Sequence, residues 1–506
     1  MKVSIEIKVT VRFLLCLVDI GLMDAIGLYA GAPPPHFAEL RVRFEGSAAN
    51  DTLLIDYWGR PTGIETVDLL SRCERRKAIK DDKGFFKFRI DSIAEIGYFS
   101  ILESGKVVLS RYMIEPGDDV QIDCYVSKKN YGETESFVAW SGNGYVVNYE
   151  RIQFNGSGST KYNIRYLSDK NSLTGLLAGP IIDRDGEYQK FNGSSACLAY
   201  SLALLSGKKR DLSNVSYDVL KADFIGEYYY LISTSLLLDK RFLKSAMTAG
   251  FKPDFGEEGE ISDNAKRLSM ELPVFFINKA KLFSWLAGYS GDYLDVFHRL
   301  KDSLSGEFRD RILYAYIEKE FMVAKNPDKM LEEALKVAQS TFWKKQLEML
   351  DTTITNGSPG YNFQLKNEYG RLVSLGDFAG KVVFIDFWFT GCFNCVNFYK
   401  EILSNVESHY KMNPGIVFLT VSVDTDENKW IKSVKSGKYT SPDSVINLYT
   451  GGLGQSHPLI AYYHIGSYPH PMLFDRSGRL LQKGNLLGST GQVMEIIDEA
   501  LKRKEQ

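Results

Sequence analysis

Residues 381–395 read KVVFIDFWFTGCFNC, and this stretch decides the fold of the C-terminal part of the chain. Its first part, 381–389, is a continuous apolar run with β-branched residues, which is typical of a central strand buried on both faces. Beyond Cys395 the apolar residues recur at a helical spacing and share one face. These residues are Val396, Tyr399, Leu403 and Val406. The sequence therefore places two cysteines where a buried strand turns into a helix.

The position of Cys392 and Cys395 at the start of this helix favours redox chemistry. Unpaired N–H groups and the helix dipole stabilise an anion there, so the thiolate form of the leading cysteine should be favoured. Two intervening residues let the second sulfur reach the first, close a disulfide loop and resolve a mixed disulfide. We expect Cys392 to be the more exposed and more reactive thiol of the pair.

A bare C-x-x-C is also found as half of a zinc site. A structural zinc site needs two more Cys or His ligands, usually as a second close pair. The sequence has no second pair, and His457, His464 and His470 are not spaced as one. We therefore expect no metal and no other cofactor at this site.

Two further residues strengthen the redox interpretation. Asp386 lies six residues before Cys392 inside the apolar strand, where desolvation should raise its pKa and suit it to proton exchange with the second thiol. The structural alternative is a carboxylate that only caps nearby backbone. Pro469 follows Tyr468 just before the apolar residues 472–474, and a proline there can simply begin a strand. A cis bond would instead expose backbone beside the disulfide for pairing with a substrate chain.

The size and charge of the chain limit what else it can be. A chain of 506 residues is too long for one core and suggests about three domains. The formal net charge of −2 gives no basic excess for nucleic acid, which we exclude as a partner. Six cysteines are too few for a scaffold built from disulfides.

Residues 33–195 are predicted to form a mostly-β, sandwich-like N-terminal domain. In GFFKFRI, the side chains of Phe86, Phe88 and Ile90 alternate with Lys87 and Arg89, which indicates a half-buried strand. The segment DVQIDCY alternates in the same way, and a turn at 115–118 precedes it. Cys124 falls on the apolar face of this second strand, so a buried, inert thiol is expected.

The remaining domains follow from changes in periodicity. Residues 196–350 are predicted to be a helical region, and residues 351–360, DTTITNGSPG, have the composition of a linker. Residues 361–506 are predicted to form the α/β domain that holds the cysteines. One helical stripe of the central region shows the periodicity clearly. It consists of Leu331, Leu335, Ala338 and Phe342.

Residues 1–32 resemble an export signal. Basic residues precede an apolar stretch, and small residues at 30–32 offer a cleavage region, an order that fits a secretory signal and predicts a periplasmic or otherwise exported protein. Asp19 and Asp24 interrupt the apolar run, so a wrongly assigned start or a buried first helix are the alternatives. No small residue precedes Cys16 as a lipobox requires, so a lipid anchor is not supported.

The run FIDFWFTGCFNC resembles the thioredoxin superfamily pattern, and 355–506 as a whole resembles its TlpA/ResA-like branch of thiol–disulfide oxidoreductases. The matching segments are 362–365, 370, 373–375, 380–381, 421–424, 430, 469–475 and 478. The resemblance implies that Cys392 is the nucleophile, Cys395 the resolving thiol, Asp386 the buried acid/base and Pro469 a cis-proline. More loosely, a β-domain and a helical region ahead of this module resemble exported Bacteroidetes thioredoxin-like proteins.

The chain also departs from the family pattern at positions that tune redox potential and substrate contact. These are Gly391 for the usual Trp, Phe393 and Asn394 between the cysteines, Lys400 for a frequent proline, and His470 after the cis-proline position. We expect the residues that contact substrate to lie around the cysteines. They are Tyr468, Pro469, Trp388, Phe393 and Asn394.

Three functions are compatible with the sequence. The first is an exported oxidoreductase that reduces or exchanges disulfides in protein substrates, its partners being protein thiols and disulfides and a redox donor. The second is a binding protein whose N-terminal domains recruit a partner for the redox centre. The third is a thiol peroxidase, which is disfavoured because Phe389 and Ile385 occupy the positions where a peroxiredoxin motif has Thr and Pro.

Overall fold

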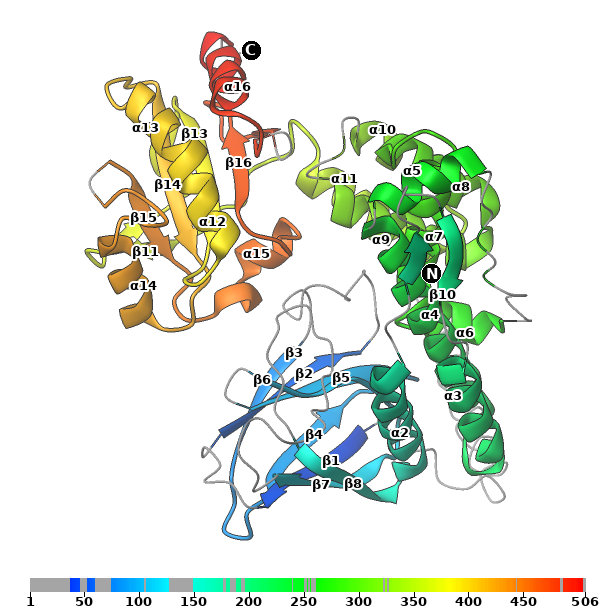
Figure 1. The fold of residues 1–506 in the computed structure, drawn as a ribbon. Helices are drawn as coiled ribbons and strands as arrows, with labels where there is room; N and C mark the ends of the chain where they lie inside the picture. The colour runs from blue at the N-terminus through cyan, green and yellow to red at the C-terminus, as the bar shows by residue number, and fades with distance from the viewer. Residues whose placement is uncertain are drawn as a thin grey trace, which may run out of the picture.

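The computed structural model describes most of the chain in three regions that follow one another along the sequence (Figure 1). The described residues are 37–45, 52–59, 74–103, 106–126, 149–175, 179–182, 188–192, 196–238, 240–249, 253, 255, 261–321, 324, 327–442, 444–482 and 486–503. The predicted export signal at 1–32, with Cys16, lies outside these residues, and so does Cys73.

The N-terminal region contains two four-stranded sheets that share one core, as the sandwich-like prediction required. Their orders are β4-β1-β7-β8 and β3-β2-β5-β6. In β4 the burial alternates strictly, with Phe86, Phe88 and Ile90 inside, and Cys124 of β7 is also buried. The strands are β1 (Phe37–Glu45), β2 (Thr52–Trp58), β3 (Glu74–Ile79), β4 (Phe86–Asp91), β5 (Gly97–Glu103), β6 (Lys106–Ile114), β7 (Asp119–Val126) and β8 (Tyr149–Ser157).

A helix inside this mostly-β region was not expected from the sequence. Helix α2 (Ser159–Gly175) follows β8 directly, although its residues have low intrinsic helix propensity. Tertiary contacts stabilise it, because Tyr162 packs in the core of the sheets and the Lys161 ammonium pairs with Asp118 from the turn before β7. A short hairpin follows, made of β9 (Gly179–Ile182) and β10 (Tyr188–Asn192).

The central region is helical, as predicted, and it packs against the N-terminal region. Apolar residues of both regions share one core cluster, which includes Tyr98 of β5 and Phe224 of α4. Arg111 of β6 pairs with Glu271, which precedes α7, at 2.6 Å. The helices are α3 (Ala196–Gly207), α4 (Asn214–Leu238), α5 (Lys240–Ala249), α6 (Asp263–Leu268), α7 (Leu272–Leu286), α8 (Tyr293–Ser303), α9 (Gly306–Glu320), α10 (Pro327–Val337) and α11 (Thr341–Ile354).

The C-terminal domain is built on a seven-stranded mixed sheet of order β12-β11-β15-β14-β13-β16-β17. The apolar run of the sequence forms β13 at its centre, where every residue is buried, paired parallel to β14 and antiparallel to β16. The strands are β11 (Leu365–Asn367), β12 (Leu372–Val373), β13 (Val382–Trp388), β14 (Ile416–Ser422), β15 (Ile446–Tyr449), β16 (His470–Phe474) and β17 (Leu480–Gln482).

Helices cover both faces of this sheet. Alternate residues of β13 enter separate cores, with Val382 and Phe384 in one and Val383 and Ile385 in the other. The first core contains α13 and α16, and the second contains α15. The helices are α12 (Phe393–Phe398), α13 (Ser404–Tyr410), α14 (Glu427–Lys435), α15 (Pro458–Tyr462) and α16 (Thr490–Lys502), with a π-helical turn at Tyr399–Leu403.

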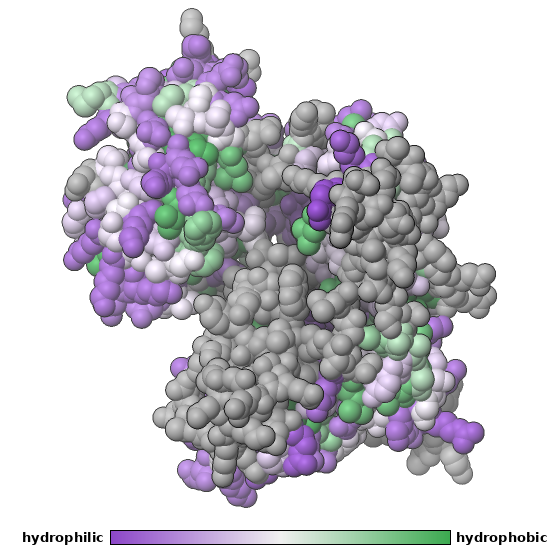
Figure 2. Space-filling model, viewed as in Figure 1, coloured by the Kyte–Doolittle hydropathy of each residue, from purple (hydrophilic) through white to green (hydrophobic). Residues whose placement is uncertain are grey.

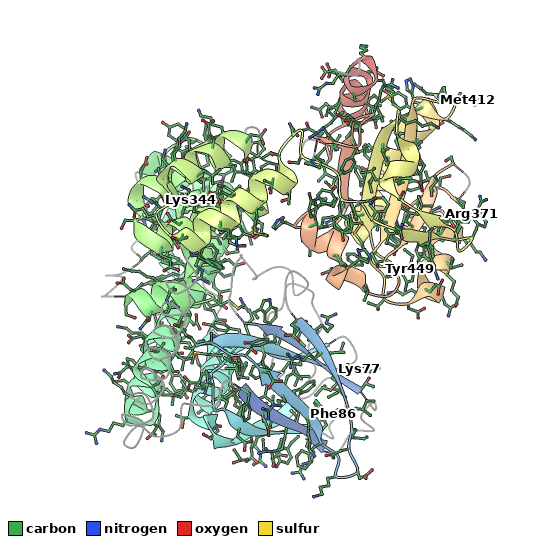
Figure 3. All side chains as sticks on the ribbon, turned by 180° about the vertical axis from the view of Figure 1, so that it is seen from behind. Lys77, Phe86, Lys344, Arg371, Met412 and Tyr449 are labelled. Carbon is green, nitrogen blue, oxygen red and sulfur yellow. A yellow bond between two sulfur atoms is a disulfide. The ribbon has the colours of Figure 1, made fainter. Side chains whose placement is uncertain are left out.

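The surface of this domain is mostly polar. Hydrophilic residues dominate the face of the C-terminal domain in Figure 2, with small hydrophobic patches between them. Arg371 and Met412 point outward at its periphery, and both are exposed (Figure 3). Among the described residues, no helix combines the length and the apolar character needed to span a bilayer.

The predicted fold class is therefore confirmed in all three parts, while the predicted domain boundaries remain proposals. One detail of those boundaries differs from the structure. The linker was placed at 351–360, but α11 extends to Ile354, and Ile354 is buried in the helical core. Residues 351–360 have the composition of a loop. The apolar side of α11 nevertheless continues through Leu347 and Leu350 to Ile354, and burial of that side extends the helix.

Candidate functional site

The two cysteines lie where the sequence placed them, between the end of β13 and the start of α12. Cys392 is the N-cap of α12, and the Cys395 N–H lies 3.0 Å from the Cys392 Sγ. The two sulfurs form a disulfide with a Cα–Cα distance of 5.3 Å. Cys392 is 6% exposed and Cys395 is 1% exposed, so the first sulfur is the more accessible one. An N–H aimed at the first sulfur stabilises a thiolate there once the disulfide is reduced.

A buried carboxylate fixes the loop between β13 and the first cysteine. The Thr390 N–H and hydroxyl donate to Asp424 at 3.1 and 2.7 Å, and the same hydroxyl lies 2.7 Å from Ser433 Oγ. The next residue, Gly391, has a φ of 103° and donates its N–H to the Tyr439 hydroxyl oxygen at 2.9 Å. These bonds hold the backbone leading into Cys392 from two other segments of the domain.

Asp386 is buried in β13, on the same face of the sheet as Trp388. It is 1% exposed, and its Oδ1 has no hydrogen-bond partner in the described part of the chain. Burial raises the pKa of Asp386 to about 8, although the backbone N–H groups of His470 and Phe387 favour the charged form and limit the rise. Asp386 is therefore mostly neutral near pH 7 and can both give and take a proton.

The segment before β16 lies against the first cysteine. The Tyr468–Pro469 bond is cis, as the resemblance implied, and the Tyr468 carbonyl oxygen lies 3.8 Å from the Cys392 Sγ. The Tyr468 ring contacts Phe389 edge-to-face at a centroid distance of 5.5 Å. Tyr468 and Pro469 are both partly exposed, so their backbone is accessible beside the disulfide.

The residues between the cysteines are exposed, but one expected contact residue is not. Phe393 is 73% exposed and Asn394 is also exposed, so both can meet a substrate. Trp388 was expected to contact substrate, and the structure corrects this. Its ring is fully buried and stacks on Tyr439 at 4.8 Å, so it supports the cysteines from beneath.

Sequence reasoning missed three residues around the site. Asp424 and Tyr439 were not assigned a role, because nothing in a single sequence indicates which distant side chains reach the loop at 390–391. Glu407 was missed although a signal was present. It follows Leu403 by four residues on an apolar helical stripe, and a charged residue at such a position is a candidate for a buried function. The structure buries it on α13, directly after Val406, which packs in a core of the domain.

The part of the chain that the structure describes contains no set of ligands for a metal ion at this site. No cluster of three or more His, Cys, Asp or Glu side chains there is arranged to hold a metal ion. The arrangement instead brings together an N-cap sulfur, a second sulfur, a buried carboxyl and an accessible carbonyl. This set is suited to thiol–disulfide exchange.

Comparison with known families addresses the fold of this domain. Residues 380–480 match a family model described as thioredoxin-like. This match spans β13, both cysteines, the cis-proline and β16, so the predicted resemblance of this domain is confirmed. The search of curated proteins found no match.

Solved structures similar to the thioredoxin-like domain carry consistent descriptions. The thioredoxin domain of a thiol-disulfide oxidoreductase from Bacteroides vulgatus is 26% identical and aligns over 28% of this chain and 99% of its own, with a TM-score of 0.25. A thiol:disulfide interchange protein from Bacteroides sp. is 25% identical over 30% of this chain and 95% of its own, with a TM-score of 0.26. A thiol-disulfide oxidoreductase from Bacteroides fragilis is 22% identical over 28% and 99%, with a TM-score of 0.24.

Proposed function

We propose that this chain is an exported thiol–disulfide oxidoreductase that reduces or exchanges disulfides in protein substrates through Cys392 and Cys395. The observation that carries the proposal is the position of the Cys392 sulfur. It caps a helix, accepts the Cys395 N–H at 3.0 Å and lies 3.8 Å from the Tyr468 carbonyl oxygen. A thiolate at that point is stabilised and lies beside backbone that can pair with an extended substrate segment.

The proposed reaction begins with the reduced protein. The Cys392 thiolate attacks one sulfur of the substrate disulfide, a mixed disulfide forms, and the other substrate sulfur leaves as a thiolate that takes a proton from water. Cys395 then loses its proton to the ionised form of Asp386 and attacks the Cys392 sulfur. The second substrate sulfur leaves as a thiolate that takes a proton from water, and two electrons have passed to the substrate. A thiol-based redox donor must reduce the Cys392–Cys395 disulfide again.

The test is a trapping experiment on the full chain. A Cys395→Ser variant should accumulate a mixed disulfide with a peptide that contains one intramolecular disulfide, whereas Cys392→Ala should neither trap nor turn over the peptide. Cys197→Ala is a matched control, since that thiol is buried in the helical region and should leave activity unchanged. Full activity in Cys392→Ala would show that the assigned nucleophile is wrong. Hydrogen peroxide consumption in place of peptide reduction would favour the peroxidase alternative.

A further inference from the structure

A second carboxyl group is buried beside the candidate site. Glu407 lies on α13 and is 4% exposed, and its Oε1 has no hydrogen-bond partner among the described residues. Asp386 on β13 shares both properties through its Oδ1. Unpaired buried carboxyl oxygens are costly, so two of them within one core need an explanation.

The fold brings these two groups together beneath the cysteines. Asp386 lies between Phe384 and Trp388 on one face of β13, because side chains alternate along a strand. Phe384 packs in one core with Val406, the residue before Glu407, and Trp388 packs in one cluster with Cys392 and Cys395. The negative charge of Asp386 also raises the pKa of Glu407, which is consistent with two carboxyls in the same core.

The surroundings of the pair contain no compensating charge in the described part of the chain. Burial and, to a smaller extent, the negative charge of Asp386 together raise the pKa of Glu407 to about 8. Apart from that charge, the pKa values of the two carboxyls are shifted by burial and, at Asp386, by the backbone N–H groups of His470 and Phe387. Two titratable side chains of neighbouring segments are connected to the pair. Cys395 of α12 packs in one cluster with Trp388, which shares a face of β13 with Asp386. Burial and the charge of Glu407 raise the pKa of Tyr399, in the π-helical turn, to about 12.

We propose that Asp386 and Glu407 form one coupled carboxyl pair that stores the proton exchanged with Cys395. Asp386 exchanges the proton with the thiol, and Glu407 is a positioning residue that acts through Asp386. This inference rests on the proposed function. Two neighbouring buried carboxyls do not ionise independently, so the protons leave in two steps that belong to the pair.

The pair takes up the proton that Cys395 loses in the resolving step. In the form of the pair that accepts the proton, Glu407 is protonated and Asp386 is ionised, and the fraction in this form grows as the pH rises towards 8. When Cys395 attacks the mixed disulfide, its proton moves to Asp386, and the pair then holds two protons and no charge. No buried negative charge remains after the substrate thiol has left, and reduction of the disulfide reverses the transfer. The substrate sulfur that leaves takes its own proton from water, so only the transfer from Cys395 to Asp386 takes place within the protein.

Redox-induced infrared difference spectroscopy tests the pair directly. The oxidised-minus-reduced spectrum of the full wild-type chain, recorded with and without ¹³C-labelled glutamate, should contain a protonated glutamate difference band that shifts with the label, because Glu407 keeps its proton while the charge of the neighbouring Asp386 is lost. Glu407→Gln should remove this band. Glu401→Gln should keep it, because Glu401 is an exposed glutamate on the same helical run. A spectrum without a glutamate band, or a band that survives in Glu407→Gln, would overturn the proposal.

The pH dependence of exchange gives a second readout that a purely structural role would not move. In Asp386→Asn the infrared titration of Glu407 should shift to lower pH by roughly one unit, a tenfold change, because the neighbouring charge is gone. In Glu407→Gln the rate profile should lose its higher ionisation and keep the lower one. Identical titration of Glu407 with and without Asp386 would contradict the coupling. If wild-type protein lacks exchange activity, the proposed function fails, whereas the redox-induced spectra still decide whether the pair exists.

Discussion

Two aspartates of this protein are buried to a similar degree but differ in their hydrogen-bond partners. Asp223 lies on α4, at the junction of the β region and the helical region, where its carboxylate accepts four hydrogen bonds. The donors are the Tyr98 hydroxyl at 2.7 Å, the Ser269 hydroxyl at 2.6 Å, the Met270 N–H at 3.1 Å and the Glu271 N–H at 3.4 Å. Asp386 lies on β13 of the thioredoxin-like domain, and its Oδ1 accepts none from the described residues.

The difference teaches that the partners of a buried carboxyl, and not its burial, separate a structural role from a chemical one. Burial raises the pKa of both groups. At Asp223 the Ser269 and Tyr98 hydroxyls favour the ionised form and work against that rise. At Asp386 only backbone N–H groups do so, and the pKa reaches about 8, in the range where a thiol also exchanges protons.

The largest expected effect of this comparison is on stability. Asp223→Ala should lower the free energy of unfolding by about 3 kcal/mol, because two hydroxyls and two backbone N–H groups lose their acceptor in a buried place. Asp386→Ala removes a similar volume but also removes the burial penalty of an unpaired carboxyl, so its loss should be much smaller. Urea unfolding at pH 7 measures both values. Equal losses would show that partners do not distinguish the two sites.

The pH dependence of stability sharpens the same comparison. Because the pKa of Asp386 is raised from 3.8 to about 8 in the folded protein, its contribution to stability is complete below pH 4 and is lost as the pH rises towards 8. Between pH 5 and 7, Asp386→Asn should therefore gain stability relative to wild type by about 1.4 kcal/mol per pH unit. Denaturation midpoints at three pH values measure this gain. Parallel curves would mean that Asp386 is ionised in the folded state.

The rate of disulfide exchange should fall about tenfold when Asp386 is replaced by asparagine, and no further, because part of the proton transfer can still go through solvent. Asp386→Asn should slow disulfide exchange without preventing formation of the Cys392–Cys395 bond. The wild-type rate should rise with pH through about 8 as Asp386 becomes the base, and the variant should lack that rise. Rate profiles from pH 6 to 9 provide the test. If the two profiles superimpose, Asp386 has only a structural role.

The smallest effect concerns the loop before Cys392. Thr390→Val removes the hydroxyl that joins Asp424 and Ser433, so exchange should slow by about fivefold, equivalent to one hydrogen bond of about 1 kcal/mol. The matched control is Thr352→Val on α11, where the hydroxyl bonds only to a carbonyl of its own helix. Peptide reduction rates and alkylation rates of Cys392 measure the outcome. An equal response of both variants would exclude a role for the loop anchor.

The sequence by itself determined the central strand, the helix after it and the place of the cysteines between them. A continuous apolar run of strand length, followed by helical periodicity, specifies both elements through local pattern and burial. The burial of Asp386 also followed, because a carboxylate at the centre of such a run has no exposed face to occupy. The alternating strands of the N-terminal region were predictable for the same reason.

Only the tertiary structure decided which distant side chains reach the site. Asp424 and Tyr439 anchor the loop at 390–391 from 34 and 48 residues away. The Trp388 ring stacks on Tyr439, and the buried Glu407 of α13 is influenced by the charge of Asp386 on β13. Helix α2 forms from residues of low propensity because the sheets offer it a core. Periodicity reports which way a side chain faces within its own element, whereas these contacts depend on how separate elements pack, and that is set by the fold as a whole.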